Sequence, residues 1–192
     1  FFGWYVNKLN SWAINTKKFK DKNSKANKDF LISGKDDLDV LKKLGLKKKI
    51  KLLEYGCGWL RSAFHFINFL DKKLYIGVDP AINRIDKGKV FFKIDNLKKS
   101  PKFIVNKNND FDFLINEKVD MIWCHAVFGH LPPKDITCIL QNAKKIMHFK
   151  TKFVFTYHKI ISHKKSKSKH KHFNFFNFFN FDKNIKRLNV RD

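Results

Sequence analysis

The sequence predicts an α/β fold with a doubly wound, mostly parallel sheet and helices on both of its faces. Three observations lead to this prediction. Five short apolar segments with strand character lie between residues 49 and 158, helical segments separate them, and a glycine turn follows the first. Strands that alternate with helices form parallel sheets joined by right-handed crossovers.

The first predicted helix covers residues 36–45, DDLDVLKKLG, whose leucines recur at helical spacing. Asp36 and Asp37 stand at its start and Gly45 at its end, where capping residues are expected. A strand then follows over residues 49–55.

The elements after that strand alternate regularly. Apolar residues on one side predict a helix over 61–70, and residues 72–79 form the second strand. Residues 81–88 form a short helix that Gly88 closes, and residues 101–107 form the third strand.

The last predicted elements are a strand, a helix and a strand. Residues 119–125 and 152–158 are the fourth and fifth strands. The helix between them covers residues 133–149 and starts at Pro133, because proline is favoured in the first turn of a helix.

The length of 192 residues suits one domain. We divide it into an N-terminal extension (1–34), a core (35–160) and a basic, Phe- and Asn-rich low-complexity tail (161–192). The tail is read either as an arm whose aromatic side chains stack on single-stranded nucleic acid or as compositional drift, which we favour. No stretch approaches the roughly 20 apolar residues of a membrane span, and the opening FFGWYV lacks the layout of a secretory signal.

The C-terminal end is expected to be incomplete. Folds of this kind normally add a helix and two strands after the fifth strand, which takes roughly 35 residues or more. Only 31 residues follow Ile161, and the chain begins with Phe1, so a fragment or a processed product is one interpretation.

The formal net charge of +24 would ordinarily indicate a nucleic-acid partner. However, only four of the 41 basic residues are arginine, the residue whose planar fork suits phosphate and base recognition. Lys, Asn, Phe and Ile are all abundant, as AT-rich codons would produce. Nucleic acid is therefore a partner that we do not favour.

The three cysteines, Cys57, Cys124 and Cys138, are widely spaced and odd in number. This pattern opposes a disulfide framework and a zinc site, and it favours a reducing cytoplasm. His125 and His130 lie five residues apart without a third ligand at a recognisable spacing, so we predict no metal.

The stretch LLEYGCG (52–58) carries the strongest functional signal. It places Glu54 near the end of a strand, with Gly56 and Gly58 in the turn into a helix, where a ligand can approach the backbone. Asp79 ends the second strand 21 residues after Gly58, a spacing that suits an acceptor for ribose hydroxyls. The alternative is a tight turn with an aspartate that caps the next helix.

The kind of nucleotide cofactor depends on the residues around this turn. A dinucleotide fingerprint would have a small residue at the sixth position counted from Gly56, where Arg61 stands. The carboxylate of Glu54 could instead meet a ligand's ammonium group, directly or through water.

These residues resemble the class I S-adenosylmethionine-dependent methyltransferases. LLEYGCGWLR looks like their first motif, YIGVD looks like the second-strand motif, and residues 119–158 are similar to the later strand–loop–helix–strand part. The GCG-x-Leu-Arg pattern looks like one bacterial branch. The resemblance covers about residues 35–160 and implies a Rossmann-like fold with S-adenosyl-L-methionine as the cofactor.

The resemblance also implies roles for single residues. Gly56, Cys57 and Gly58 would pass closest to the methionine portion, Glu54 would help to hold its amino group, and Asp79 would take the ribose hydroxyls. The sequence departs from the family at Leu60, where many members have a third glycine, so the turn must accommodate a side chain.

The later motifs imply the remaining roles. Asp110 or Phe111 would flank adenine, with the register NNDFDF uncertain by two residues. His125 would face the sulfonium end and the acceptor, and it is our candidate general base.

The resemblance implies a methyltransferase that acts on an O or N nucleophile of a small-molecule or glycan-type acceptor, which fold-level analogy alone selects. One alternative is an RNA or protein methyltransferase that uses the basic surface. The other is a non-catalytic or truncated remnant.

Overall fold

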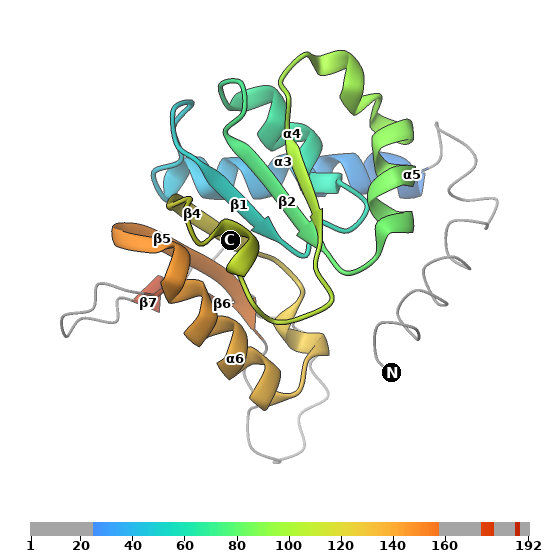
Figure 1. The fold of residues 1–192 in the computed structure, drawn as a ribbon. Helices are drawn as coiled ribbons and strands as arrows, with labels where there is room; N and C mark the ends of the chain where they lie inside the picture. The colour runs from blue at the N-terminus through green and yellow to red at the C-terminus, as the bar shows by residue number, and fades with distance from the viewer. Residues whose placement is uncertain (1–24, 158–173, 179–186, 189–192) are drawn as a thin grey trace, which may run out of the picture. The chain divides into compact units, whose positions relative to one another are not determined.

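A computed structural model describes residues 25–157, together with residues 174–178 and 187–188 (Figure 1). The predicted extension before residue 25 and most of the predicted tail lie outside the described residues. The chain divides into two compact units, residues 1–108 and residues 109–192. Each unit is described by itself.

The first unit contains a parallel sheet in the order β3-β2-β1. These strands are β1 (Leu52–Tyr55), β2 (Tyr75–Asp79) and β3 (Lys102–Val105). Its helices are α3 (Lys25–Lys43), α4 (Arg61–Phe69), α5 (Ile82–Phe92) and the 3-10 turn η1 (Ile94–Leu97). Every residue of β2 is buried, as expected for a central parallel strand.

The second unit contains the parallel strands β4 (Val119–Cys124) and β5 (Met147–Tyr157), joined through α6 (Pro133–Ala143). Its 3-10 turns are η2 (Asp112–Leu114), η3 (Phe128–His130) and η4 (Lys144–Ile146). Strand β6 (Asn174–Phe178) runs antiparallel to β5, and β7 (Arg187–Leu188) antiparallel to β6. All five predicted parallel strands are present, and the Rossmann-like fold class is confirmed.

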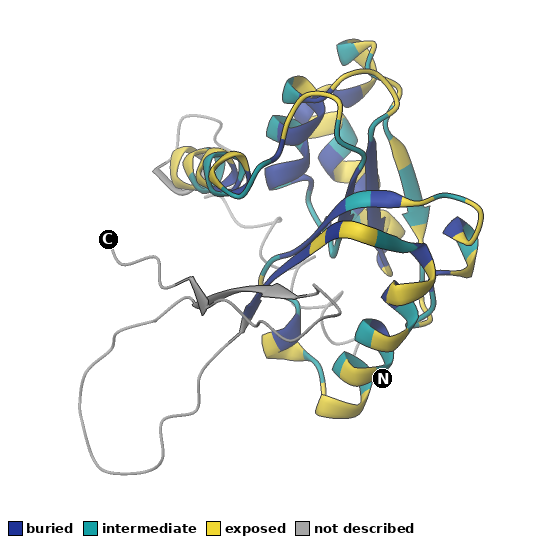
Figure 2. Ribbon diagram, turned by 90° about the vertical axis from the view of Figure 1, so that its left-hand side faces the viewer, coloured by how far each residue is buried: buried dark blue, intermediate teal, exposed yellow. Residues whose placement is uncertain are grey.

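Each unit has an apolar core on its strands, seen as dark blue ribbon in Figure 2. In the first unit, Leu52 and Ile76 on the strands and Phe66 on α4 are at most 2% exposed. In the second unit, Trp123 and Phe153 are fully buried and belong to the core. None of the helices in the described part of the chain is both long enough and apolar enough to cross a membrane.

The predicted start of the first helix, at Asp36 and Asp37, is wrong. Helix α3 begins at Lys25 and runs past both residues, so the expected boundary at residues 34–35 falls inside it. Asp37 is only 5% exposed and faces α4 instead of capping a helix. The end is closer to the prediction, since α3 stops at Lys43 and Gly45 turns with a φ of 102°.

The predicted end of the helix after β2 is also wrong. Helix α5 continues through Gly88 to Phe92 and closes at Lys93, which has a φ of 49°. A Cβ at Gly88 would lie 2.7 Å from Leu60 Cγ and 2.7 Å from the Trp59 carbonyl oxygen. Gly88 is therefore a close-packing residue inside a helix, not a terminator.

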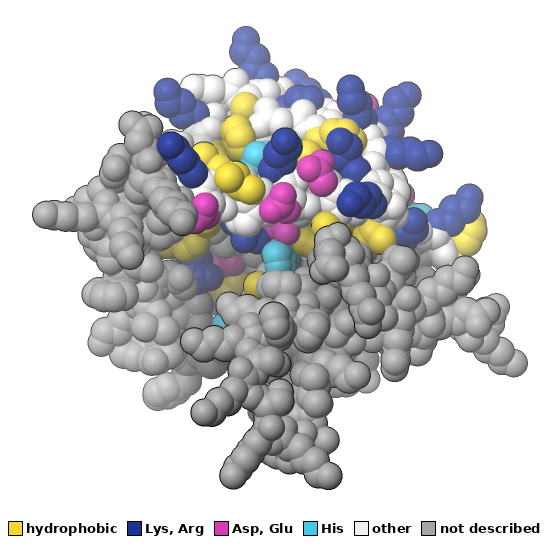
Figure 3. Space-filling model, turned by 180° about the vertical axis from the view of Figure 1, so that it is seen from behind, with side chains coloured by type: hydrophobic (Ala, Val, Ile, Leu, Met, Phe, Trp, Pro, Cys, Tyr) yellow, Lys and Arg dark blue, Asp and Glu magenta, His cyan; other side chains and the backbone are white. Residues whose placement is uncertain are grey.

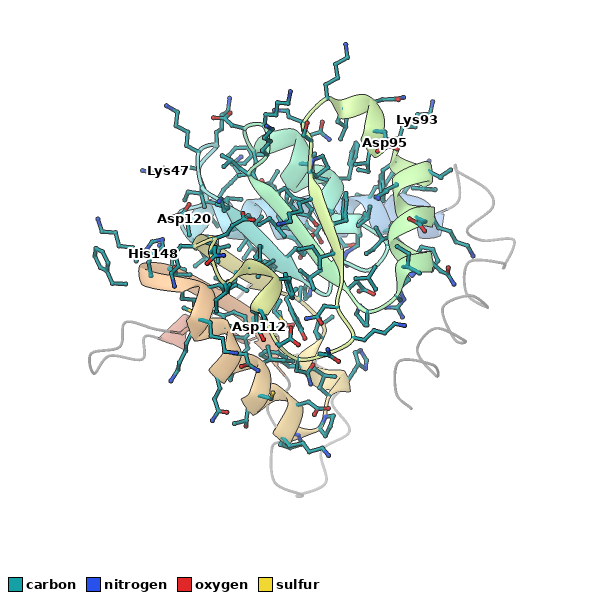
Figure 4. All side chains as sticks on the ribbon, in the orientation of Figure 1. Lys47, Lys93, Asp95, Asp112, Asp120 and His148 are labelled. Atoms are coloured by element: carbon teal, nitrogen blue, oxygen red, sulfur yellow. The ribbon has the colours of Figure 1, made fainter. Side chains whose placement is uncertain are left out.

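The predicted helix over 133–149 is too long. Helix α6 ends at Ala143, and Met147 already belongs to β5. Contacts to β4 hold this segment as a strand: Thr151 Oγ1 donates to the Val119 carbonyl at 2.6 Å, and His148 Nε2 lies 3.0 Å from Asp120 Oδ1 (Figure 4). Strand pairing thus overrides the helical spacing that the sequence continues through Ile146.

Candidate functional site

The glycine turn after β1 is attached to the end of β2. The N–H groups of Gly56 and Cys57 donate to the Val78 carbonyl oxygen at 2.7 Å and 3.0 Å. Gly56 has a φ of 84° and Gly58 a φ of 47°, backbone angles that glycine adopts without steric cost. The chain can therefore turn sharply at the carboxyl end of the strand, as the sequence predicts.

Asp79 joins this turn to the helix that follows β2. Its Oδ2 accepts the Gly58 N–H at 2.9 Å, and its Oδ1 accepts the Ala81 N–H at 2.9 Å, just before α5. The tight turn of the alternative interpretation is thus present, but Asp79 does not cap α5, whose N-cap is Ala81 without a side-chain cap bond. A carboxylate has about four lone-pair sites, so these two bonds leave acceptor capacity for a ligand.

Gly58 places backbone without a side chain next to the Asp79 carboxylate. A Cβ at Gly58 would lie 3.8 Å from Asp79 Oδ2 and 3.9 Å from the Gly56 carbonyl oxygen, which are ordinary contact distances. The backbone at Gly58 is therefore accessible, with a carboxylate beside it. Burial raises the pKa of Asp79, and the Ala81 N–H and the Arg84 charge oppose that rise.

Glu54 is buried beneath the turn and is 4% exposed. The Tyr75 hydroxyl donates to Glu54 Oε2 at 2.5 Å. Burial raises the pKa of Glu54 to about 8, although the Tyr75 hydrogen bond opposes the rise. This carboxyl group is therefore mostly neutral at pH 7 in the ligand-free protein.

Cys57, between the two glycines, is buried, with a side chain 4% exposed. Burial raises the pKa of its thiol well above the ordinary value, and the nearby Glu54 and Asp79 add to the rise. A protonated, buried thiol is a poor nucleophile, so we assign Cys57 a structural role in the turn.

Leu60 completes the turn in an unusual conformation. It is the N-cap of α4, with a φ of 60° and a ψ of 27°, and its side chain is fully buried. A left-handed conformation in a residue with a Cβ costs roughly 1–2 kcal/mol. The side chain fits because Gly88 of α5 leaves room for it.

Arg61, the first residue of α4, connects the turn to α3. Its Nη2 donates to Asp37 Oδ2 at 2.9 Å and its Nη1 to Ser33 Oγ at 3.1 Å. The Ser62 hydroxyl donates to the same Asp37 oxygen. Helix α3 thereby braces the start of α4.

The structure brings Glu54, Gly56, Cys57, Gly58 and Asp79 together in the first unit. Sequence reasoning missed Tyr75 and the bracing role of Asp37 there. A tyrosine at a strand start is not distinguishable from a core residue by spacing, and Asp37 looked like a cap.

The other predicted site residues belong to the second unit. Asp110 is half-buried, whereas Phe111 is fully buried, with its ring 6.0 Å from that of Phe113. His125 follows β4 and is half-buried, with its ring 5.4 Å from that of Trp123. Within the described ranges, no group of three or more His, Cys, Asp or Glu side chains could hold a metal ion.

A family model described as a methyltransferase domain matches residues 52–148. No curated protein sequence is similar enough to this chain to count as a relative.

Solved structures share the fold at low identity. Magnesium protoporphyrin IX methyltransferase from Synechocystis PCC 6803, with bound S-adenosylhomocysteine, is 12% identical with a TM-score of 0.61, over 82% of this chain and 73% of that one. The PH0226 protein from Pyrococcus horikoshii OT3 is 18% identical with a TM-score of 0.59, over 94% and 82%. Phosphoethanolamine N-methyltransferase 1 from Haemonchus contortus, in complex with phosphoethanolamine and S-adenosylhomocysteine, is 15% identical with a TM-score of 0.60, over 81% and 31%.

Proposed function

We propose a function on one premise: this chain belongs to the methyltransferase domain family. Its cofactor is S-adenosyl-L-methionine, and it is an enzyme that transfers a methyl group. The acceptor, in our proposal, is an O or N nucleophile on a small molecule or a glycan-type molecule. The observation that carries the proposal is the glycine turn, whose Gly58 N–H bonds to the buried carboxyl group of Asp79.

The first unit would hold the cofactor. Asp79 accepts hydrogen bonds from the ribose hydroxyls while it keeps its bonds to the Gly58 and Ala81 N–H groups. The backbone of Gly56, Cys57 and Gly58 lies against the methionine portion. Glu54 lies under the turn and interacts with the amino group, directly or through one water.

The family relation assigns further roles to residues of the second unit, taken by itself. Asp110 flanks adenine better than Phe111 does, because Asp110 is half-buried and the Phe111 side chain is part of the core. His125 takes the proton of the acceptor, because a histidine imidazole can act as a general base.

S-adenosylmethionine supplies an electrophilic methyl group when it is bound, so the protein contributes mainly alignment. Holding the nucleophile in line with the methyl group and the sulfur supplies most of the rate enhancement, because the entropy cost of bringing the two reactants together is already met on binding. A general base such as His125 adds to this.

Two observations support the choice of acceptor. The Haemonchus enzyme binds phosphoethanolamine, a small molecule. The scarcity of arginine in a chain of net charge +24 weighs against the alternative, an RNA or protein substrate. We also propose a cytoplasmic location, from the three widely spaced cysteines.

The test is calorimetric titration of the purified chain with S-adenosylmethionine, with NAD as the control ligand. We expect micromolar binding of the first and none of the second. Asp79→Ala should weaken binding at least about tenfold, or about 1.4 kcal/mol, because charge-assisted bonds to ribose are lost. Asp71→Ala, at an exposed aspartate of the same unit, is the matched control and should bind normally.

Two results would contradict the proposal. Unchanged affinity in Asp79→Ala would remove the ribose assignment. Failure of a folded wild-type sample to bind the cofactor would favour the non-catalytic remnant.

A further inference from the structure

Tyr75 reaches the Glu54 carboxyl group from the neighbouring strand. Tyr75 is the first residue of β2, and Glu54 on β1 pairs in register with Gly77, two residues further along β2. The Tyr75 side chain therefore leans along β2, over Gly77, to bring its hydroxyl 2.5 Å from Glu54 Oε2. Both side chains are buried, at 2% and 4% exposure.

Gly77 is what allows this path. A Cβ at Gly77 would lie 2.9 Å from the Tyr75 hydroxyl oxygen, 3.0 Å from Phe103 Cδ1 and 3.1 Å from Cys57 Sγ. Real Cβ atoms essentially never approach another atom within 3.0 Å. The space that a side chain at Gly77 would take is thus occupied by the Tyr75 phenol, the Phe103 ring of β3 and the Cys57 thiol of the glycine turn.

The charged and titratable groups that act on Glu54 come from several elements of the first unit. Tyr75 and Asp79 belong to β2, Cys57 to the turn, Asp37 to α3 and Arg61 to α4. Asp37 and Asp79 disfavour a second negative charge, whereas Arg61 and the Tyr75 hydroxyl favour it. Burial is the largest influence and raises the pKa of Glu54 to about 8.

We propose that Tyr75 is a positioning residue of the cofactor site: its hydroxyl holds the Glu54 carboxyl group that meets the cofactor's ammonium group. Because burial raises the pKa of Glu54 to about 8, this carboxyl group is neutral without the cofactor and releases its proton to solvent when the ammonium group binds. This inference rests on the proposed function. The step is balanced, because the carboxylic acid becomes a carboxylate, the proton goes to the buffer, and the ammonium provides the counter-charge.

The sign of the pH dependence follows directly. Below about pH 8, binding must remove a proton from Glu54, so affinity for the cofactor rises as the pH rises toward 8. Above about pH 8 the cofactor's own α-amino group loses its proton, so affinity should fall again. At pH 7, a group with a pKa of about 8 is roughly nine-tenths protonated, so about one proton is released per cofactor bound.

The experiment is calorimetric titration with S-adenosylmethionine at about pH 6.5, 7, 7.5 and 8, which covers the range up to the pKa of Glu54. Each titration is repeated in two buffers of different ionisation enthalpy, because the difference in heat gives the number of protons released. For the wild type at pH 7 we expect release of about 0.5 to 1 proton. Glu54→Gln, which cannot titrate, should release none beyond what the ligand itself contributes.

Tyr75→Phe removes the hydroxyl and keeps the ring. Without this donor the carboxylate is harder to form, so affinity at pH 7 should fall about fivefold or more and the pH profile should move upward. Tyr55→Phe removes a hydroxyl next to Glu54 in sequence and is the matched control, with the wild-type profile. A merely structural role for Tyr75 would lower affinity equally at every pH and would overturn the proposal.

A second readout needs no cofactor. Infrared difference spectra of the ligand-free protein should show a protonated carboxyl band at pH 7 that is absent in Glu54→Gln. If the band is missing, or the cofactor binds without proton release, this inference fails while the proposed function stands. If a folded wild type binds no S-adenosylmethionine although the band is present, the proposed function fails, and with it the coupling to binding.

Discussion

Asp79 and Glu54 are two buried carboxyl groups in the same unit, and their different hydrogen bonds give their charged forms different stability. Asp79 accepts two backbone N–H groups, which stabilise its charged form. Glu54 accepts one tyrosine hydroxyl, and burial outweighs that single bond. Asp79 is consequently the better acceptor for hydroxyl groups, and Glu54 is a group that can change its charge.

This difference predicts a pH-dependent stability that Glu54→Gln removes. The folded-state pKa of about 8 exceeds the ordinary value of 4.5, so the folded protein binds the proton more tightly than the unfolded chain. The stability that the neutral carboxyl group contributes is present below pH 4.5 and is lost as the pH rises to 8. The loss for the wild type is on the order of 3 to 5 kcal/mol at 1.36 kcal/mol per pKa unit.

Urea denaturation between pH 5 and 8, a window taken from the raised pKa of Glu54, measures this effect. The free energy of unfolding should fall less steeply with pH in Glu54→Gln than in the wild type. Glu117→Gln, at the only other glutamate in the chain, is the control and should keep the wild-type slope. Parallel curves for wild type and Glu54→Gln would disprove the assignment.

In the first unit, one glycine and one aspartate determine how two helices pack at the glycine turn. Gly88 lets α5 approach Trp59 and Leu60 at the glycine turn. Asp37 lets α3 grip the first turn of α4 through Arg61 and Ser62. Both contacts shape the turn from outside it.

Gly88→Ala should destabilise the protein although alanine is the better helix former. The gain of about 1 kcal/mol in helix propensity is outweighed by overpacking, which typically costs 1–3 kcal/mol when a Cβ is forced against backbone. Its matched control is Lys87→Ala on the exposed side of α5.

A double variant with Leu60→Ala tests the partner in this contact. Truncating the buried leucine alone should cost about 2–5 kcal/mol. The double variant should lose less than the sum, because the new Cβ enters space that Leu60 vacated; the Trp59 carbonyl oxygen keeps the rescue partial. Simple additivity in thermal or urea unfolding would refute the pairing.

Asp37→Asn should weaken the contact between α3 and α4 and so lower the free energy of unfolding. The amide keeps the size of the side chain but cannot form the ion pair with Arg61, whose side chain is 28% exposed. Because Arg61 is partly exposed, we expect a loss of about 2 kcal/mol in the free energy of unfolding, below the cost of a fully buried pair.

Asp39→Asn on the same helix is the control. Its side chain is 49% exposed and pairs with Lys42 at 3.9 Å, so the expected loss is below about 0.5 kcal/mol. Equal losses in the two variants would show that Asp37 does not brace α4.

At the scale of the whole molecule, the sequence carries a formal net charge of +24. On the face in Figure 3, lysine and arginine side chains are scattered, with acidic and hydrophobic side chains between them. Scattered lysines attract phosphate without reading sequence. The charge therefore predicts non-specific attraction to RNA.

Binding of a short single-stranded RNA should be weak and steeply salt-dependent. Fluorescence anisotropy at about 50 and 200 mM salt should show a loss of several hundredfold or more, the behaviour of multiple phosphate contacts. Two unrelated RNA sequences should bind equally at each salt concentration. A sequence preference that persists at the higher concentration would move the RNA methyltransferase alternative ahead of our proposal.

The sequence by itself determined the fold class and the glycine turn at the centre of the candidate site. Alternation of apolar strands with helices is local, and LLEYGCG followed by Asp79 is a spacing along the chain, so both can be read without coordinates. The five parallel strands and the turn at Gly56 and Gly58 follow from these patterns.

Only the tertiary structure decided what each side chain contacts. Asp37 became a buried brace because α3 starts earlier than its acidic residues suggested, and Gly88 stayed inside a helix because the glycine turn packs against it. Tyr75 acquired its role from a partner on the neighbouring strand and from the gap at Gly77. Such contacts join residues about 20 or more positions apart, and local spacing carries no information about them.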